Sequence, residues 1–262
     1  MRIHQPSPAP TTAPVATGTT PTDGHAPRKC IVLVRHGQTT FNVEKRLPGQ
    51  LPGIPLTEEG RRQAVRAAVA LSGLPLTTII SSPLERARDT ALLIARGWGL
   101  SVLTDDRLMD TDVGHWSGRQ LDEIAKSDPA WKAFVEHGSQ PPVGVESLAH
   151  VMERAVAVVE QLRHDERAGE YIVVVAHADV VKLIVAHYLG IAVDCAHFMS
   201  IDNASISALG FEGEGTPAVL TLNWTPIPGW LFPRATSPEA VAAVPVPPES
   251  VQPTANGLDH QR

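Results

Sequence analysis

Two histidines, His36 and His177, stand directly after the two apolar runs that most resemble buried strands. In open α/β sheets ligands bind beyond the carboxyl ends of strands, so both imidazoles are expected at one edge of a sheet, where they could converge. Arg35 supplies a cation before the first histidine, and Gly37 after it lets the backbone approach a ligand closely. This combination favours a ligand-binding site over a structural role for His36.

Coincidence is a serious alternative, because the chain contains eleven histidines in all. A single histidine after a strand is more often a hydrogen-bonded core or surface residue. Five histidines lack neighbours of this kind and are expected to be structural or exposed: His115, His137, His150, His164 and His187.

The surroundings of both histidines resemble the histidine phosphatase superfamily, the phosphoglycerate mutase-like proteins. Matches to that family occur in the same chain order in five segments: 33–39 (Leu-Val-Arg-His-Gly-Gln-Thr), 55–60 (Pro-Leu-Thr-Glu-Glu-Gly), 81–87 (Ser-Ser-Pro-Leu-Glu-Arg-Ala), 108–118 and 175–177 (Val-Ala-His). One Arg-His-Gly triplet would be weak evidence, whereas five ordered matches are strong. The agreement spans about residues 29–207 and leaves both ends of the chain outside it.

The resemblance implies a role for each matching residue. His36 would attack phosphorus and form a phosphohistidine, which splits one difficult displacement into two. His177 would donate a hydrogen bond to a phosphoryl oxygen as charge develops. Arg35, Arg86 and Asn42 would bind the phosphate, and planar guanidinium groups suit its equatorial oxygens. From spacing alone Arg86 would instead be an exposed helix charge, and only the resemblance favours the site.

Asp110 is the candidate proton donor for the leaving alcohol. The family usually places Glu at this position, and Asp is one methylene shorter and more acidic when unperturbed, which affects its reach and its proton supply. A second departure is Asp179 in the sequence His-Ala-Asp-Val-Val-Lys. Asp179 is expected to cap the following helix, since Asp is favoured at that position. The alternative is that it supplies the proton in place of Asp110.

The elements that would position these residues alternate between strands and helices. Continuous apolar runs at 30–34 and 171–176 predict strands covered on both faces. Further strands are expected at 77–80, 100–103, 205–209 and 218–223, and whether the last two pair antiparallel is open. Helices are expected at 57–71, from Ser82 to Gly97 with the Ser82 hydroxyl as its cap, at 146–163 and at 180–188. The pattern predicts an α/β fold, a three-layer sandwich whose mainly parallel central sheet is flanked by helices, like phosphoglycerate mutase.

Composition narrows the function classes. The net charge of −6 and the pI near 6.0 give no general attraction for nucleic acid or anionic lipid. No apolar run approaches the roughly 20 residues that span a bilayer. We therefore expect a soluble, cytoplasmic protein that acts on a small phosphorylated metabolite, with no nucleic acid or membrane partner and no cofactor. Whether it forms a homodimer is open. Cys30 and Cys195 have apolar neighbours and are expected to be buried, reduced thiols.

Three regions are expected along the chain. Residues 1–27 are rich in Pro, Thr and Ala and predict a disordered extension, and 233–262 predict a disordered Pro-rich tail. Residues 28–232 would form the histidine phosphatase domain. Within it, the segments 47–54 and 131–144 are expected to cover the pocket and select the alcohol, the latter through Trp131 and Phe134.

The leading interpretation is a phosphatase that hydrolyses small phosphomonoesters through a phosphohistidine on His36 without a metal ion. A phosphoglycerate mutase-like phosphomutase is the nearest alternative; it is disfavoured because no additional basic cluster stands between residues 104 and 146. A noncatalytic phosphate-binding module is the second alternative. A metal site made of His36, His177 and Asp110 is disfavoured, because the flanking arginines would repel a cation.

Overall fold

The computed structural model describes residues 29–138 and 140–227. The predicted extension at 1–27 and the predicted tail at 233–262 lie outside the described residues, as does the end of the predicted domain. The chain alternates between strands and helices: β1 Lys29–Arg35, α1 Thr40–Glu44, α2 Glu58–Leu71, β2 Thr78–Ser81, α3 Glu85–Ala95, β3 Val102–Thr104, α4 Leu121–Ser127, α5 Pro129–Glu136, α6 Leu148–His164, β4 Tyr171–Ala176, α7 Ala178–Leu189, β5 Ile206–Phe211 and β6 Ala218–Trp224.

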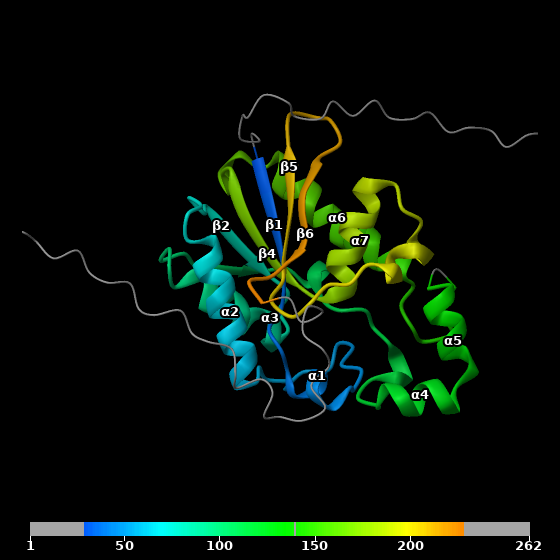
Figure 1. Cartoon of the computed structure of the whole chain (residues 1–262). Helices are drawn as coiled ribbons and strands as arrows, with labels where there is room; N and C mark the ends of the chain where they lie inside the picture. Colours follow the sequence, from blue (N-terminus) through cyan, green and yellow to red (C-terminus); the bar gives the residue numbers. More distant parts are fainter. Residues whose placement is uncertain (1–28, 139, 228–262) are drawn as a thin grey trace, which may run out of the picture. The chain divides into compact units, whose positions relative to one another are not determined.

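A six-stranded sheet forms the centre, in the order β3-β2-β4-β1-β5-β6 (Figure 1). β1, β2, β3 and β4 pair in parallel, while β5 pairs antiparallel with β1, and β6 antiparallel with β5. The mainly parallel sheet and the antiparallel end strands of the prediction are confirmed. Parallel neighbours require long crossovers, and the helices between the strands supply them.

Helices cover both faces of the sheet and produce three layers (Figure 1). Alternate residues of β1 point to opposite faces: Ile31 and Leu33 pack with α6 and α7, and Val32 and Val34 pack with α2 and α3. Both faces are therefore apolar, which explains why β1 and β4 are continuous apolar runs in the sequence. The structure confirms the three-layer α/β architecture.

A smaller cluster lies apart from the two main cores, in the segment between β3 and α6. Its centre is the fully buried Trp116, which packs against Ile124 of α4 and Phe134 of α5. The sequence reading assigned no elements to 105–145, so α4 and α5 are additions to the prediction. The predicted loop after β1 also contains a short helix, α1. Short helices of this kind have too few turns for a clear apolar period.

Two local predictions were wrong. The helix expected from Ser82 begins at Glu85 as α3, and its N-cap, Leu84, makes no side-chain capping bond. Cys195 is exposed rather than buried, whereas Cys30 is buried as expected; both are free thiols. Within the described ranges, no helix is both long and apolar enough to cross a membrane.

Candidate active site

Strand register brings the two histidines together. Arg35, the last residue of β1, pairs with Ala176, the last residue of the parallel neighbour β4. The next residue of each strand is therefore a histidine at the same edge of the sheet. The ring centroids of His36 and His177 lie 5.3 Å apart. The convergence expected from the sequence is present in the structure.

The ring of His36 has a defined orientation. Its Nδ1 lies 2.7 Å from the carbonyl oxygen of Gly37, and since a carbonyl can only accept, Nδ1 carries the proton and donates it. Nε2 of a neutral ring then holds a free electron pair. Burial, helped by the positive charges of Arg35 and Arg86, holds the pKa of His36 well below its usual range. The ring is therefore neutral, and Nε2 is the atom that can offer an electron pair.

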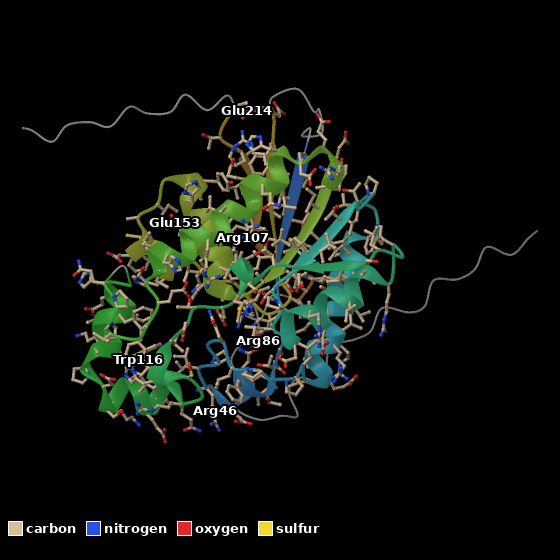
Figure 2. The ribbon with its side chains drawn as sticks, turned by 180° about the vertical axis from the view of Figure 1, so that it is seen from behind. Arg46, Arg86, Arg107, Trp116, Glu153 and Glu214 are labelled. Carbon is tan, nitrogen blue, oxygen red and sulfur yellow. The ribbon has the colours of Figure 1, made fainter. Side chains whose placement is uncertain are left out.

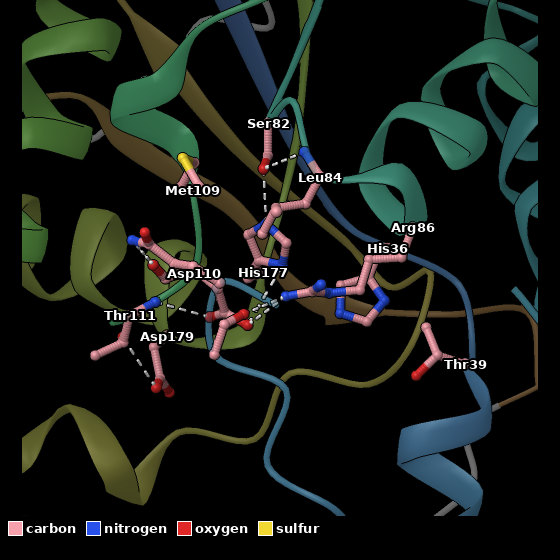
Figure 3. A network of polar contacts seen from close by, with 12 residues as sticks. His36, Thr39, Ser82, Leu84, Arg86, Met109, Asp110, Thr111, His177 and Asp179 are labelled. Atoms are coloured by element: carbon pink, nitrogen blue, oxygen red, sulfur yellow. Dashed lines mark hydrogen bonds and ion pairs between the residues drawn. The ribbon is translucent and has the colours of Figure 1, made fainter. Parts of the chain in front are cut away.

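The ring of His177 contacts the protein through its other nitrogen, Nε2 (Figure 3). Its Nε2 lies 2.9 Å from the hydroxyl oxygen of Ser82, which accepts a hydrogen bond from the backbone N–H of Leu84 at 3.3 Å. Ser82 can thus donate its own hydrogen to Nε2, which leaves the proton of the neutral ring on Nδ1. Burial and then the charge of Arg86 lower the pKa of His177 well below its usual range. His177 therefore presents one N–H donor to the site.

Two guanidinium groups lie beside the imidazoles. Arg86 of α3 is fully buried, and its Nη2 donates to Gly49 O at 2.8 Å and to Asp110 Oδ2 at 3.0 Å. Arg35 donates from Nη1 to Ile201 O at 2.6 Å. The exposed helix charge suggested by spacing alone is contradicted for Arg86.

Several buried N–H donors of the site have no hydrogen-bond partner among the described residues: Arg35 Nε, Arg86 Nε, Arg86 Nη1 and His177 Nδ1. Buried donors are nearly always paired in proteins, because an unpaired one costs about 1–3 kcal/mol. Donors from β1, α3 and the end of β4 that lack protein partners fit an anion as their acceptor.

Asn42 joins this group through the first turn of α1. Its Oδ1 accepts from the backbone N–H and the hydroxyl of Thr39 at 3.0 Å each, and from Asn203 Nδ2 at 3.1 Å. The same Asn203 Nδ2 donates to His36 O at 3.2 Å, which settles which atom of that amide is nitrogen. Three donors therefore face Oδ1 of Asn42, and its Nδ2 is the amide atom left to donate to a ligand.

Asp110 lies beside His177 and Arg86 (Figure 3). Its Oδ2 contacts Arg86 at 3.0 Å and lies 3.5 Å from His177 Nδ1. Its backbone carbonyl accepts from Gln50 Nε2 at 2.9 Å and from Arg154 Nη2 at 3.0 Å. The shorter aspartate side chain thus reaches the cluster, because contacts from two other elements hold its loop close.

A pocket of about 200 Å³ opens onto the cluster. Leu47, Pro48 and Gly49 line it, as the sequence analysis expected of the segment 47–54. Trp131 and Phe134 are not among its lining residues and pack with Trp116 instead. The expectation that the segment 131–144 covers the pocket through these aromatic side chains was therefore wrong.

Asp179 also lines the pocket, and it does not cap a helix. The N-cap of α7 is His177, and Asp179 lies inside the first turn. Its carboxylate lies 3.5 Å from the hydroxyl of Thr111 and 3.5 Å from Lys182 Nζ. The capping role expected from the sequence is contradicted, because α7 begins two residues earlier than the apolar run suggested.

Comparison with known proteins agrees with this geometry. The family model described as "Histidine phosphatase superfamily (branch 1)" matches residues 31–225. The chain belongs to the histidine phosphatase superfamily. It is 34% identical over 185 residues to the "Probable phosphoglycerate mutase GpmB" of Cronobacter sakazakii, covering 70% of this chain and 85% of the relative.

Solved structures of the superfamily share the fold. A mycobacterial glucosyl-3-phosphoglycerate phosphatase solved with VO3 is 35% identical, with a TM-score of 0.64, over 70% of this chain and 92% of that one. Bacillus stearothermophilus YhfR is 30% identical, with a TM-score of 0.69, over 74% and 96% of the two chains. These similarities show the phosphoglycerate mutase-like architecture expected from the sequence.

Three residues that shape the site were missed in the sequence. Ser82 was interpreted as a helix cap, although it directly follows β2 at the same sheet edge as the histidines, which was a usable signal. Asn203 and Arg154 carry no local signal, because each acts on residues more than forty positions away. Among the described residues, no group of three His, Cys, Asp or Glu side chains is arranged to hold a metal ion.

The two buried imidazoles predict how the stability of the protein depends on pH. In the unfolded chain each binds a proton as the pH falls through about 6.5, but in the folded chain each stays neutral because its pKa is lowered. Protons therefore favour the unfolded state. The free energy of unfolding should fall below this pH by up to about 1.4 kcal/mol per pH unit for each histidine.

Urea unfolding at about pH 7.5, 6.5 and 5.5 measures this dependence. The variant His36→Asn/His177→Asn should lose this part of the slope. An equal slope in the variant and in the wild type would show that other groups cause the dependence.

Proposed function

We propose that this protein is a phosphatase that hydrolyses small phosphomonoesters through a phosphohistidine on His36, without a metal ion. The observation that carries the proposal is the set of buried N–H donors without protein partners on Arg35, Arg86 and His177, gathered around the neutral ring of His36. Two guanidinium groups supply the positive charge that a phosphoryl group requires during transfer.

In the first step, Nε2 of His36 attacks phosphorus and the bond to the ester oxygen breaks. The equatorial oxygens accept hydrogen bonds from Arg35, Arg86 and Nδ1 of His177, with Asn42 Nδ2 as a further donor. The neutral state of both imidazoles suits these roles, since one must offer an electron pair and the other a single proton. Removing one preorganised donor of this kind typically costs about 10²- to 10³-fold in rate.

The departing alkoxide takes a proton from Asp110, which lies on the His177 side of the cluster. In the structure Arg86 Nη2 holds this carboxylate next to the unpartnered Nε and Nη1 that would bind the phosphate. In the second step Asp110, now ionised, accepts a proton from water, whose oxygen attacks phosphorus. The bond to His36 Nε2 breaks, and phosphate and the neutral imidazole are restored.

The comparisons support phosphoryl transfer and leave the acceptor to be tested. One relative is named a phosphatase and another a probable mutase. Phosphate release from a panel of phosphomonoesters should proceed with a chelator present. Under the same conditions, with no bisphosphate primer, exchange of the phosphoryl group between phosphorylated and free alcohol should be far slower. Exchange faster than release would favour the phosphomutase. A noncatalytic binding module would show neither.

Asp110→Asn tests the proton donor. This variant should lose about 10²- to 10⁴-fold with alkyl phosphates, which have a poor leaving group, and far less with 4-nitrophenyl phosphate, whose leaving group needs little protonation. Equal losses on both esters would contradict the assignment and leave Asp179 as the alternative donor.

Arg154 of α6 is expected to position Asp110. Its Nη1 donates to the carbonyls of Arg107 and Met109, its Nη2 to that of Asp110, and Glu146 holds it at 2.8 Å. Arg154→Met should therefore lower kcat about tenfold or more for alkyl phosphates and much less for 4-nitrophenyl phosphate.

The background variant Asp110→Asn supplies the control for Arg154. Without the acid there is nothing to position, so Arg154→Met should cost little further activity in that background. A merely structural role would reduce the hydrolysis of both esters alike, in either background. Arg154→Lys should restore part of the lost activity if the hydrogen bonds to the carbonyls matter.

A further inference from the structure

The pocket wall beyond the phosphate-binding donors contains charges that the proposed chemistry does not use. Of the described charged residues that line the pocket, Arg35 and Asp110 have roles in the proposed transfer. Arg46 and Asp179 remain. Arg46 lies just after α1, and Asp179 lies in the first turn of α7. A substrate alcohol would lie beside them, so their charges and their contacts with other residues determine which alcohols fit.

Asp179 is open to a ligand. Its side chain is 42% exposed and points toward Thr111 at the pocket (Figure 3). Its two contacts, with the Thr111 hydroxyl and with Lys182 Nζ, are both 3.5 Å long, well beyond the usual 2.7–3.0 Å of a charged hydrogen bond. A carboxylate can accept about four hydrogen bonds, so both oxygens retain capacity for donors on a substrate.

Arg46 is less available than its charge suggests. Its Nε donates to Gly118 O at 2.8 Å, its guanidinium stacks over Phe41 at 4.9 Å, and Glu44 lies 3.6 Å from its Nη1. These contacts hold the side chain against the wall, and Glu44 offsets part of its charge. Lys182 is also close to Asp179 but does not line the pocket.

A carboxylate on the substrate that lies beside Asp179 would meet its like charge, while the two cations of the described wall, Arg35 and Arg46, already donate to Ile201 O and Gly118 O. Two like charges a few ångströms apart at a partly exposed site disfavour binding by a factor of about ten. A hydroxyl group in the same place can donate to the carboxylate oxygens. The pocket thus favours hydrogen-bond donors beside the phosphate and disfavours acids.

We infer that Asp179 selects phosphomonoesters of neutral, hydroxyl-bearing alcohols, such as polyol or sugar phosphates, and rejects phosphorylated carboxylic acids. The inference rests on the proposed phosphatase activity and names its substrate class. It separates this chain from relatives named for phosphoglycerate substrates, whose substrates carry a carboxylate.

A matched pair of esters tests it. Glycerol 3-phosphate and 3-phosphoglycerate differ only in a hydroxymethyl group in place of a carboxylate. The full chain should hydrolyse glycerol 3-phosphate with a kcat/KM about tenfold higher or more. Asp179→Asn should reduce that preference about tenfold, mainly through faster hydrolysis of 3-phosphoglycerate. Lys182→Met should increase the preference, because it leaves the charge of Asp179 less compensated.

Glu153→Gln is the control for loss of one negative charge. Glu153 is exposed on α6 and lies well away from Arg86 and Arg46 (Figure 2), so this change should leave the preference unaltered. Hydrolysis of 4-nitrophenyl phosphate reports the proposed function separately.

Three outcomes would overturn the inference. The first is hydrolysis of 4-nitrophenyl phosphate without a preference for glycerol 3-phosphate, which would leave the proposed function standing. The second is that Asp179→Asn loses the hydrolysis of both glycerol 3-phosphate and 3-phosphoglycerate, which would make that residue part of the chemistry. The third is no release from any ester, which would end both proposals.

Discussion

Replacing His36 with alanine should lower kcat/KM for every phosphomonoester by at least about 10⁴-fold, because no other described group can take its place as the nucleophile. The buried ring presents Nε2 with a free electron pair, since Nδ1 donates to Gly37 O. Among the described residues the cluster holds one other imidazole, His177, whose Nε2 is bound to Ser82 and whose protonated Nδ1 faces the site. It cannot offer an electron pair from the atom that faces the site.

Two measurements check this result. Steady-state release of phosphate gives the size of the loss. Rapid quenching of the wild type with substrate labelled on phosphorus should trap label on the protein in a form stable to alkali and labile to acid, as a phosphohistidine is. His36→Ala should trap none.

His187→Ala is the matched control, because this histidine is exposed on α7 and lies outside the cluster. Its activity and labelling should equal those of the wild type. Label retained on His36→Ala would contradict the assignment of the nucleophile. Activity within tenfold of the wild type would contradict a covalent mechanism on this residue.

Replacing Arg86 with methionine should separate activity from stability. The guanidinium is fully buried, with Nε and Nη1 unpartnered among the described residues, so the folded chain carries the cost of an incompletely paired cation. Replacing both partners of a buried ion pair with apolar groups of similar size is often neutral or stabilising by about 1–4 kcal/mol, whereas removing one partner is destabilising where the other charge stays buried and unpaired. Asp110 would lose its partner, but it is partly exposed and can be hydrated.

We therefore expect Arg86→Met to lower kcat/KM about 10²- to 10³-fold while the free energy of unfolding stays within about 1 kcal/mol of the wild type or rises. Kinetics with 4-nitrophenyl phosphate and urea unfolding measure the two quantities. Arg86→Lys keeps the charge but not the planar fork, so it should recover only part of the activity. A loss of several kcal/mol with little change in rate would show that the pair with Asp110 is structural.

The two histidines of the candidate site stood out in the sequence because each follows a strong local pattern. His36 and His177 come directly after the buried strands β1 and β4, and the segment with Arg86 begins a helix after a third strand. Strand and helix patterns arise from periods of two and 3.6 residues, which a sequence displays directly. The fold class followed from their alternation, and the family resemblance added the roles that spacing alone did not indicate.

The errors share one origin. Ser82 and Asp179 were both interpreted as helix caps, a role judged from neighbouring residues, and both proved to face the pocket or a histidine of the site. The segment with Trp131 was assigned to the pocket by its place along the chain, but its aromatic rings pack around Trp116. A local pattern cannot show which distant group a polar side chain meets.

The sequence by itself therefore determined the elements, the family and the identity of the candidate nucleophile. Only the tertiary structure decided how the rings of His36 and His177 are oriented, that Arg86 is buried with free donors, and how Arg154 holds the loop of Asp110. The physical reason is that a hydrogen-bond partner is chosen by distance in space. That distance depends on the register of β1 against β4 and on helix packing, which join residues more than a hundred positions apart.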